Sequence, residues 1–263
     1  MDESDTQRGA PEAVERMPAD RAIWASWYDL DEGPKATFLG WLHGECLPFL
    51  RERRDCLWVA HYQSSAVGAA MRHVRDAILA RPAEDVGSGT QFLMLLGARA
   101  PDSFLGPAFE VDFGGGPGFR DMLGQRRGVR TCLFLEETRV DGPAPRAPDH
   151  GLTPAPAIQM GSLCMRGVEE ELDLARWYRQ LRRPAMTRTP GCIAARKLLS
   201  VAGWAKHAIL YEFASLEDRM RHFEEAQEAK ALDPTHWTSR IARTTVHAPG
   251  SPTVGQRIWP PAP

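Results

Sequence analysis

The chain has 263 residues, of which 43% are hydrophobic and 25% charged, as in an ordinary globular protein of one large or two small domains. Its formal net charge of −2 argues against nucleic-acid binding, which favours a strongly basic face. No apolar run approaches the ~20 residues that cross a bilayer, and residues 1–20 hold no apolar segment typical of a signal peptide. We therefore expect a cytoplasmic protein that binds neither nucleic acid nor a membrane.

The first part of the chain reads as a leader followed by a strand, a helix and a second strand. Residues 1–20 are polar and are expected to be a disordered leader. Residues 22–30 are rich in aromatic and β-branched residues and end in a turn signal, which predicts a strand. Apolar residues then recur at helical spacing over 35–53, with Pro48 as a kink or an end of the regular helix. A second strand is expected at 57–63.

The following stretch adds elements before a boundary. Residues 69–80 are helical by pattern and are expected to cap a sheet edge or to cover a pocket. Strands are expected at 91–98 and 129–140, with a short helix at 119–123 between them. The proline-dense stretch 143–156 is predicted to be a linker.

The second part of the chain repeats the first at a fixed offset. Four pairs of landmark residues each lie 136 positions apart: Trp41 and Trp177, Pro48 and Pro184, Cys56 and Cys192, Ser64 and Ser200. The pattern predicts strands at 157–165, 192–200, 207–213 and 239–247, helices at 169–186 and 216–231, and a proline-rich surface arm at 248–263.

Each half, residues 21–142 and 157–247, is thus expected to be a β-α-β-β-α-β unit of the ferredoxin-like kind. Helices cover one face of such a sheet and leave the other bare. A bare apolar face of several hundred Å² is unstable alone, so we expect the two bare faces to pack together and close a barrel. The predicted fold class is therefore α+β.

These residues resemble the dimeric α+β barrel superfamily, in particular its EthD-like branch, here duplicated in tandem within one chain. That branch carries a W-Y-x-x-E-H-x-P signature on its first helix. The first half keeps Trp41, Glu45 and Pro48 of it, with Cys46 at the position of the histidine. In the second half Trp177, Tyr178 and Pro184 match, and Arg182 takes the histidine position.

The resemblance implies several activities, because the superfamily includes cofactor-free monooxygenases, lactone isomerases, polyketide cyclases and decarboxylases, and haem-dependent enzymes. Fold alone does not choose among them. The leading hypothesis is a cofactor-independent enzyme of small aromatic or polyketide-like metabolites that works by proton abstraction, isomerisation, decarboxylation or oxygenation. The alternatives are a non-catalytic module that binds a hydrophobic ligand or a partner, and a haem-dependent enzyme with His207 or His222 as axial ligand. Association of chains into a homo-oligomer is left open.

The candidate catalytic residues in the first half are His43 and His61. His43 lies on or beside the buried stripe of the first helix, where it is either a general base or a partly buried surface histidine. His61 lies in the second strand, and Lys197 occupies the corresponding place in the second half. Either these two line the same pocket twice, or they alternate toward solvent.

The second half holds the densest polar set. His207 and Arg182 are the candidate catalytic residues there, as groups that stabilise the oxyanion of an aromatic acid. The alternative is that the cations stay on the solvated face. The candidate substrate-binding residues are Trp177, Tyr178, Arg196, Lys197, Trp204 and Tyr211. The five cysteines form no C-x-x-C pair and no H-x-x-x-H or H-E-x-x-H motif occurs, so no metal ion is expected.

Overall fold

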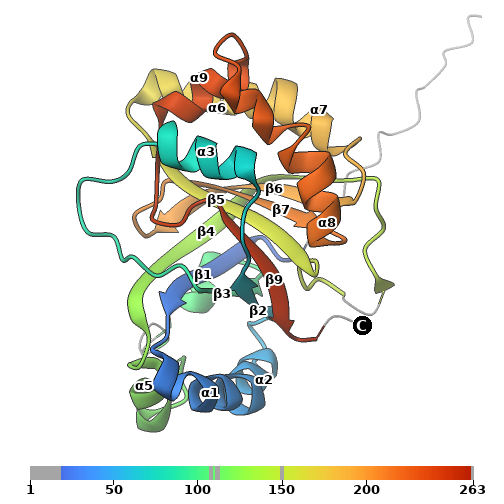
Figure 1. Ribbon diagram of the computed structural model, residues 1–263. Coiled ribbons are helices and arrows are strands. Elements are labelled where there is room, and N and C mark those ends of the chain that lie inside the picture. The colour runs from blue at the N-terminus through green and yellow to red at the C-terminus, as the bar shows by residue number, and fades with distance from the viewer. Residues whose placement is uncertain (1–18, 107–108, 110–112, 149–150, 262–263) are drawn as a thin grey trace, which may run out of the picture.

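The computed structural model describes residues 19–106, 109, 113–148 and 151–261. Of the expected leader, residues 1–20, only the last two lie in the described part. Figure 1 shows a barrel of strands between two layers of helices: α1, α2 and α5 lie below it, and α3, α6, α7, α8 and α9 lie above it.

The first half supplies four strands and the lower helices. The residues of β3 are buried over its whole length, as in a strand covered on both faces. Pro48 is the second residue of α2, directly after the π-helical turn η1, so it lies within a continuous run of helical backbone. In chain order the elements are β1 (Ala22–Asp29), α1 (Glu32–Trp41), the π-helical turn η1 (Leu42–Cys46), α2 (Leu47–Arg51), β2 (Trp58–Ser64), α3 (Ala69–Ala77), β3 (Phe92–Ala98), the 3-10 turn η2 (Pro101–Phe104), α5 (Pro117–Leu123) and β4 (Arg127–Asp141).

The second half repeats this order with a more broken second helix. The helix expected at 216–231 is divided into three short pieces, α8, η5 and η6. The elements are β5 (Ala157–Met165), α6 (Val168–Trp177), the π-helical turn η4 (Tyr178–Arg182), α7 (Arg183–Met186), β6 (Cys192–Ala202), β7 (His207–Phe213), α8 (Leu216–Asp218), the π-helical turn η5 (Arg219–Glu224), the 3-10 turn η6 (Glu228–Leu232), α9 (Trp237–Thr244), β8 (Thr245–His247) and β9 (Thr253–Trp259).

The strands form one closed antiparallel barrel. Neighbours follow the order β4-β1-β3-β2 in the first half and β6-β7-β5-β8 in the second, which is the order of a ferredoxin-like sheet in each case. The halves join where β4 pairs with β6 and where β9 lies between β2 and β5. Eight strands close the ring, and β8 extends from β5 outside it. The predicted fold class, two ferredoxin-like halves closing a barrel, is confirmed.

The strand expected at 239–247 is largely wrong. Residues Trp237–Thr244 form helix α9, and only Thr245–His247 pair as strand β8. The side chain of His236 caps the helix by accepting a hydrogen bond from the backbone N–H of Thr238. Helical spacing also explains the burial, since Thr238, Ser239, Ile241 and Ala242 all face the core.

The surface arm expected at 248–263 is also wrong. Strand β9 lies inside this stretch and is hydrogen-bonded to a neighbour on each side. The indole Nε1 of Trp27, in the barrel interior, donates to Thr253 Oγ1 at 3.0 Å and ties β9 to the first half. The prolines that suggested an arm flank this strand and do not interrupt it.

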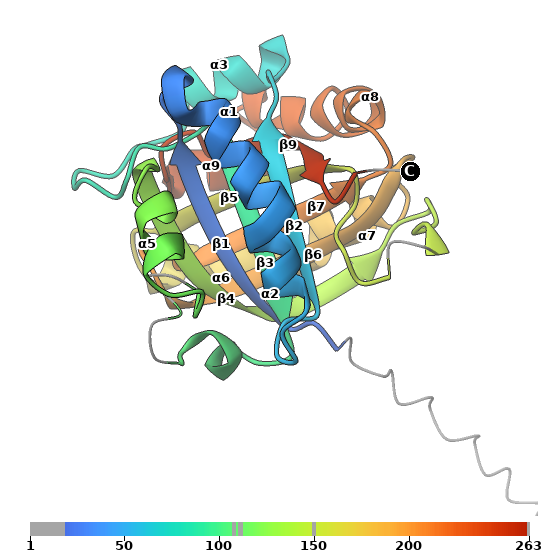
Figure 2. The same ribbon diagram turned by 90° about the horizontal axis from the view of Figure 1, so that it is seen from below.

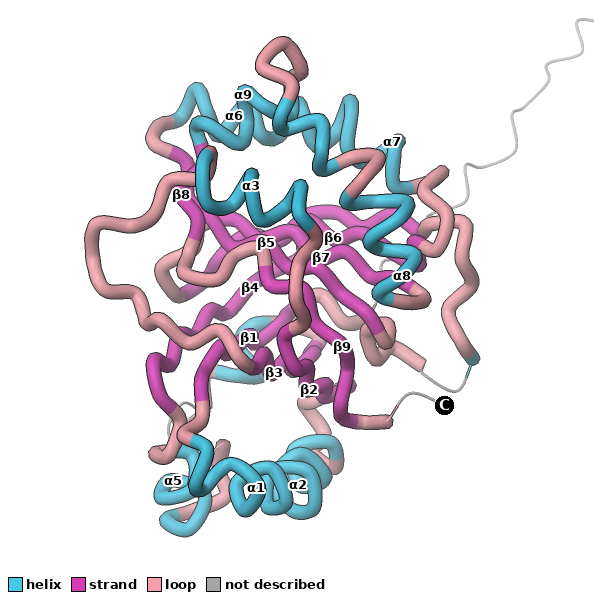
Figure 3. The backbone as a smooth tube through the Cα atoms, viewed as in Figure 1, coloured by secondary structure: helices cyan, strands magenta, loops and turns pink. Residues whose placement is uncertain are grey.

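The inner faces of the two halves share one apolar interior, as expected. Its side chains come from strands of both halves, and Figures 2 and 3 show how the strands of the two halves cross around it. The outer faces carry two further cores, one under α1, α2 and α5 and the other under α6 and α9. Across the described residues, every helix is too short or too polar to traverse a bilayer. The main interior residues are Ile23, Trp27, Trp58, Tyr62, Leu93, Phe134, Ile158, Met160, Leu198 and Leu210.

One end of the barrel interior is filled by charges. Arg196 donates to Asp20 at 2.8 Å and to Glu212 at 3.1 Å, and all three side chains are fully buried. Arg139 donates to the other oxygen of Asp20 at 2.9 Å, and Arg146 to the other oxygen of Glu212 at 2.8 Å. Each carboxylate is therefore shared by two guanidinium groups, which is the arrangement that makes a buried charge tolerable.

The close approach of Gly97 to the ring of Trp58 gives a test of this packing. A methyl group on Gly97 would overlap the indole, so Gly97→Ala should lower the free energy of unfolding by about 1–3 kcal/mol. Gly40→Ala in α1 is the control: its methyl group meets nothing within 4 Å, and it should raise stability by up to about 1 kcal/mol. Urea unfolding of both variants measures this, and a Gly97→Ala protein as stable as wild type would contradict the packing.

Candidate functional site

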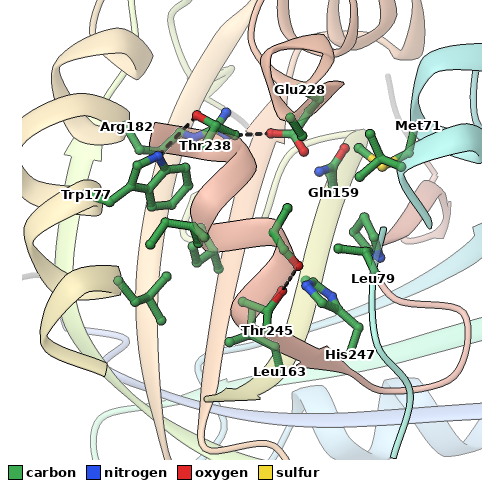
Figure 4. A pocket seen from close by; sticks show the side chains of 18 of the residues that line it. Met71, Leu79, Gln159, Leu163, Trp177, Arg182, Glu228, Thr238, Thr245 and His247 are labelled. Carbon is green, nitrogen blue, oxygen red and sulfur yellow. Dashed lines mark hydrogen bonds and ion pairs between the residues drawn. The ribbon is translucent and has the colours of Figure 1, made fainter. Parts of the chain in front are cut away.

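A cavity lies in the second half, between the outer face of the sheet and the upper helices. It encloses about 80 Å³. Figure 4 shows that β5, β7, α6 and α9 form its walls and that α3, from the first half, brings Met71 toward it. Residues 69–80 were expected to cap a sheet edge or to cover a pocket, and α3 in this stretch contributes Met71 and Val74 to the lining. Most of the lining is apolar: Met71, Val74, Leu79, Leu163, Leu174, Trp177, Ile209, Ala231, Ile241, Ala242 and Pro252.

Arg182 is the principal charged group of the cavity. It ends the π-helical turn η4 and is 4% exposed. Its guanidinium lies 4.7 Å from the ring of Trp177, 5.1 Å from that of Phe223 and 5.7 Å from that of Tyr211. Such ring faces attract a cation electrostatically, so the aromatic walls hold the guanidinium in place.

The hydrogen bonds of Arg182 are incomplete. Nη2 pairs with Glu228 Oε1 at 2.7 Å, whereas Nη1 is buried and has no partner among the described residues. A buried N–H without an acceptor is costly, and such a group in a cavity is satisfied by a ligand or a water molecule. Among the described lining residues Glu228 is the one acid, so the cavity offers a donor and a carboxylate side by side.

His247 adds a neutral polar group at the other end of the cavity. Its Nδ1 lies 3.1 Å from the Ser251 hydroxyl. Burial, with a further contribution from Arg81, lowers the pKa of His247 to about 3. The imidazole is therefore uncharged near neutral pH, as an apolar cavity requires.

A buried polar chain fixes α3 over the cavity. Gln159 of β5 accepts hydrogen bonds from Arg219, and Arg219 pairs with Glu224. The Glu224 carboxylate accepts from the backbone N–H groups of Gly68 and Met71, each at 3.1 Å, at the beginning of α3. A carboxylate at a helix N-terminus satisfies free N–H groups and opposes the positive end of the helix dipole.

A second group of titratable residues lies in the first half. His43 Nε2 is 2.9 Å from His61 Nδ1, and His61 Nε2 is 2.8 Å from the Tyr28 hydroxyl. Tyr28 and His61 are fully buried, whereas His43 is half-buried. Burial lowers the pKa of both histidines, most strongly for His61. The structure thus brings together the two histidines predicted for the first half.

Some of the other predicted site residues line the cavity, and the rest lie elsewhere in the second half. Trp177, Arg182 and Tyr211 line the cavity together. Tyr178 is buried beside it in the same core, with its hydroxyl unpaired among the described residues. Arg196 lies on the opposite face of the sheet, in the charged end of the barrel.

Lys197, His207 and Trp204 lie outside the cavity lining. Lys197 pairs with Glu137, and Trp204 Nε1 donates to Glu84 at 2.5 Å. Both ring nitrogens of His207 are buried and lack a hydrogen-bond partner among the described residues. Burial, and next the charge of Lys197, lower the pKa of His207 to about 4.

Tyr28, Gln159, Glu228 and His247 belong to these groups, and none of them was predicted from the sequence as a site residue. Glu228 stands in a strongly charged stretch that resembles the solvated face of a helix. His247 ends a stretch that was predicted to be a strand and to which no role in a site was given. The signal available was the internal offset, which places Arg182 where the related signature has a histidine and so directs attention to its neighbours.

The described residues that line this cavity fit neither a metal ion nor a haem. Within the described residues, no three His, Cys, Asp or Glu side chains gather closely enough to hold a metal. A cavity of about 80 Å³ is far below the ~300 Å³ or more of ordinary cofactor pockets. His207 does not line it, and His222 lies in a groove beside α7, so neither predicted axial ligand reaches this space.

Solved structures share this fold at very low sequence identity. A candidate monooxygenase from Fusobacterium nucleatum is 7% identical, with a TM-score of 0.58 over 92% of this chain and 94% of that chain. An anthrone oxidase-like protein is 8% identical, with a TM-score of 0.55 over 92% of each chain. A candidate chlorite dismutase is 12% identical, with a TM-score of 0.55 over 92% of this chain and 96% of that chain. No protein-family model and no curated protein matches the sequence. The likeness shows that the fold is the dimeric α+β barrel.

The unpaired His207 gives a pH prediction. Its folded-state pKa lies below the ordinary 6.5, so stability is complete above pH 6.5 and is lost as pH falls toward 4, because the unfolded chain binds the proton first. His207→Leu should reduce the slope of unfolding free energy against pH in this window by about 1 kcal/mol per pH unit. Chemical unfolding at several pH values measures the slope. The exposed His73→Leu is the matched control, and equal slopes in both variants would refute the assignment.

The anchor of α3 gives a second prediction. Glu224→Gln removes the negative charge that holds both Arg219 and the beginning of α3. Amide hydrogen exchange over residues 68–74 should accelerate at least tenfold, while β1 and β3 stay protected. The neighbouring, exposed Glu225→Gln should leave α3 unchanged, and unchanged exchange in Glu224→Gln would show that this contact does not hold the helix.

Proposed function

We propose that the protein is a cofactor-independent enzyme that binds a small carbonyl compound, of the aromatic or polyketide-like class, in the second-half cavity. The observation that carries the proposal is Arg182: a buried guanidinium inside a mostly apolar space, whose Nη1 donor has no partner among the described residues. Apolar walls with a few convergent polar groups are the usual composition of a small-molecule site.

The proposed reaction is abstraction of a proton from the carbon next to the carbonyl. Arg182 Nη1–H donates to the carbonyl oxygen, and the Glu228 carboxylate accepts the proton. The electron pair of the broken C–H bond forms a C=C bond while the carbonyl π pair moves to oxygen, so negative charge develops where the guanidinium lies. In a substrate with a C=C bond next to that carbon, the enolate extends over the double bond, and return of the proton to its far end gives an isomerised product with no other reactant consumed.

The size of the cavity limits the substrate. An engineered cavity of ~150 Å³ accepts benzene, whereas this one encloses about 80 Å³. A substrate with an aromatic ring therefore requires outward movement of α3, whose N-terminus the Glu224 carboxylate anchors. His207, His43 and His61 remain proposed catalytic residues; of the four proposed in total, only Arg182 lines this cavity.

The family membership and the evolutionary origin of the chain are proposals as well. We propose membership of the EthD-like branch and an origin by tandem duplication, supported by the element bounds: α1 and α6, and likewise η1 and η4, begin and end 136 residues apart. The proposed halves are residues 21–142 and 157–247, with α3 and β9 crossing between them.

The names of two structural neighbours, a candidate monooxygenase and an anthrone oxidase-like protein, support the proposal that this protein is an enzyme. A cytoplasmic location and association into homo-oligomers are proposed on the soluble character of the composition and on the fold.

The competing proposal is a non-catalytic module that binds a small hydrophobic ligand in the same cavity. The predominantly apolar lining favours it. It differs from the enzyme in one respect, since it needs no proton transfer and therefore no role for the Glu228 carboxylate.

Two variants distinguish these proposals. With a panel of small aryl ketones, calorimetry measures binding, and NMR measures exchange of the proton next to the carbonyl for deuterium. Glu228→Gln should keep binding within a few-fold and slow exchange by ~10²–10⁴. Arg182→Gln should weaken binding at least tenfold. The control is Arg179→Gln, because Arg179 lies on the same π-helical turn but is exposed.

The outcomes separate cleanly. Binding that depends on Arg182, without any exchange in wild type, would support the binding module and refute the enzyme. Binding that is unaffected by Arg182→Gln would refute the proposed site in either form.

A further inference from the structure

The first half contains a line of three hydrogen-bonded rings that the proposed cavity does not use. Tyr28, His61 and His43 run from the fully buried sheet to the half-buried π-helical turn η1. The rings of Tyr28 and His61 are 5.9 Å apart and nearly parallel, at 5°, and Phe92 stacks on both. Stacking fixes the ring planes, so the hydrogen bonds have little freedom to rearrange.

The direction of these hydrogen bonds follows from the buried hydroxyl. His61 Nε2 is the one hydrogen-bond partner of the Tyr28 hydroxyl among the described residues. A buried O–H group must donate to avoid an unpaired proton, so Tyr28 donates and His61 Nε2 accepts. His61 then carries its proton on Nδ1 and donates it to His43 Nε2. His43, in turn, must carry its own proton on Nδ1.

We propose that the line Tyr28–His61–His43 makes His43 Nδ1–H a neutral hydrogen-bond donor at the surface of the first half, forming a second ligand site that takes the oxygen of a small phenolate or enolate. His43 is the group that touches the ligand. His61 and Tyr28 are positioning residues, because they fix which nitrogen of His43 bears the proton. The site lies on the outer face of the first half, away from the cavity of Arg182.

The surroundings keep the three rings uncharged. Burial lowers the pKa of His61 well below its ordinary value, and the neighbouring His43 adds to this effect. The charged or titratable groups acting on Tyr28 are Arg126, whose guanidinium lies 5.5 Å from the ring, and the buried thiol of Cys46. A neutral imidazole N–H stabilises negative charge on oxygen without having to lose a proton itself.

The arrangement belongs to the first half alone. At the same offset the second half has Cys164, Arg179 and Lys197 in place of Tyr28, His43 and His61. Arg182 and His43 nevertheless both stand on the corresponding π-helical turns η4 and η1. Such turns occur often at functional sites, because the extra residue reorients the side chains that follow.

The first test reads the proton positions directly. Long-range proton–nitrogen NMR of the full chain labelled in histidine should show His43 and His61 both protonated on Nδ1, the less common form of free histidine. In the double variant Tyr28→Phe/His61→Leu, which removes both buried polar partners and leaves no unpaired atom, His43 should return to the common Nε2–H form. A wild-type His43 protonated on Nε2 would overturn the proposal.

The second test uses 4-nitrophenol as the probe. Near its own pKa the bound probe should favour the phenolate, seen as increased absorbance at long wavelength, with shifts of the His43 ring signals. His43→Leu should abolish both effects, and the double variant should weaken binding several-fold while keeping the protein folded. Arg182→Gln should leave them unchanged, which separates this site from the cavity. Probe binding that persists in His43→Leu, or that disappears in Arg182→Gln, would refute the second site.

Discussion

The shared interior of the barrel is the constraint on which the rest of the structure depends. Each half leaves one apolar sheet face uncovered, and the two faces are buried only against each other. The space between them is filled by large side chains such as Trp27 and Trp58, and the charges of Arg196, Asp20 and Glu212 occupy its end. The interior is packed, and the cavity of Arg182 lies instead on an outer face, between the sheet of the second half and the helices above it.

Both candidate sites lie on outer faces, at corresponding places. In each half, the first helix passes through a π-helical turn, and that turn carries His43 in one half and Arg182 in the other. The local surroundings differ: Arg182 lies against aromatic rings beside a cavity, whereas His43 lies at the end of a hydrogen-bonded line of rings. One backbone arrangement therefore presents two different chemistries, a permanent cation and a neutral donor.

The sequence allowed much of the fold to be predicted because the relevant signals were local or periodic. The offset between Trp41 and Trp177 reproduces the ends of α1 and α6, and the strands at 91–98 and 129–140 lie where their apolar patterns place them. Strand β9 could not be predicted in the same way. Its pairing with β2 is a contact across almost 200 residues, and no local pattern distinguishes such a partner from solvent.

The candidate site was predictable only in part, for a similar reason. Trp177, Arg182 and Tyr211 lie on elements that pack together in any ferredoxin-like unit. Their proximity therefore follows from the fold. Whether Arg196 faces the cavity or the barrel depends on strand register, because adjacent strand residues point to opposite faces. The role of Glu228 depends on the breaks within 216–231, which bring a residue of a charged stretch against a buried guanidinium.

The position of β9 has a consequence for how the chain is made. The ring cannot close until residue 259 has emerged from the ribosome, although β1 to β4 are complete more than a hundred residues earlier. Throughout that interval the edge of β2 lacks its final neighbour, and an exposed strand edge is a template for pairing with another chain. Slow translation of the second half would therefore favour aggregation of the nascent protein, and a chaperone that shields the β2 edge would favour its maturation.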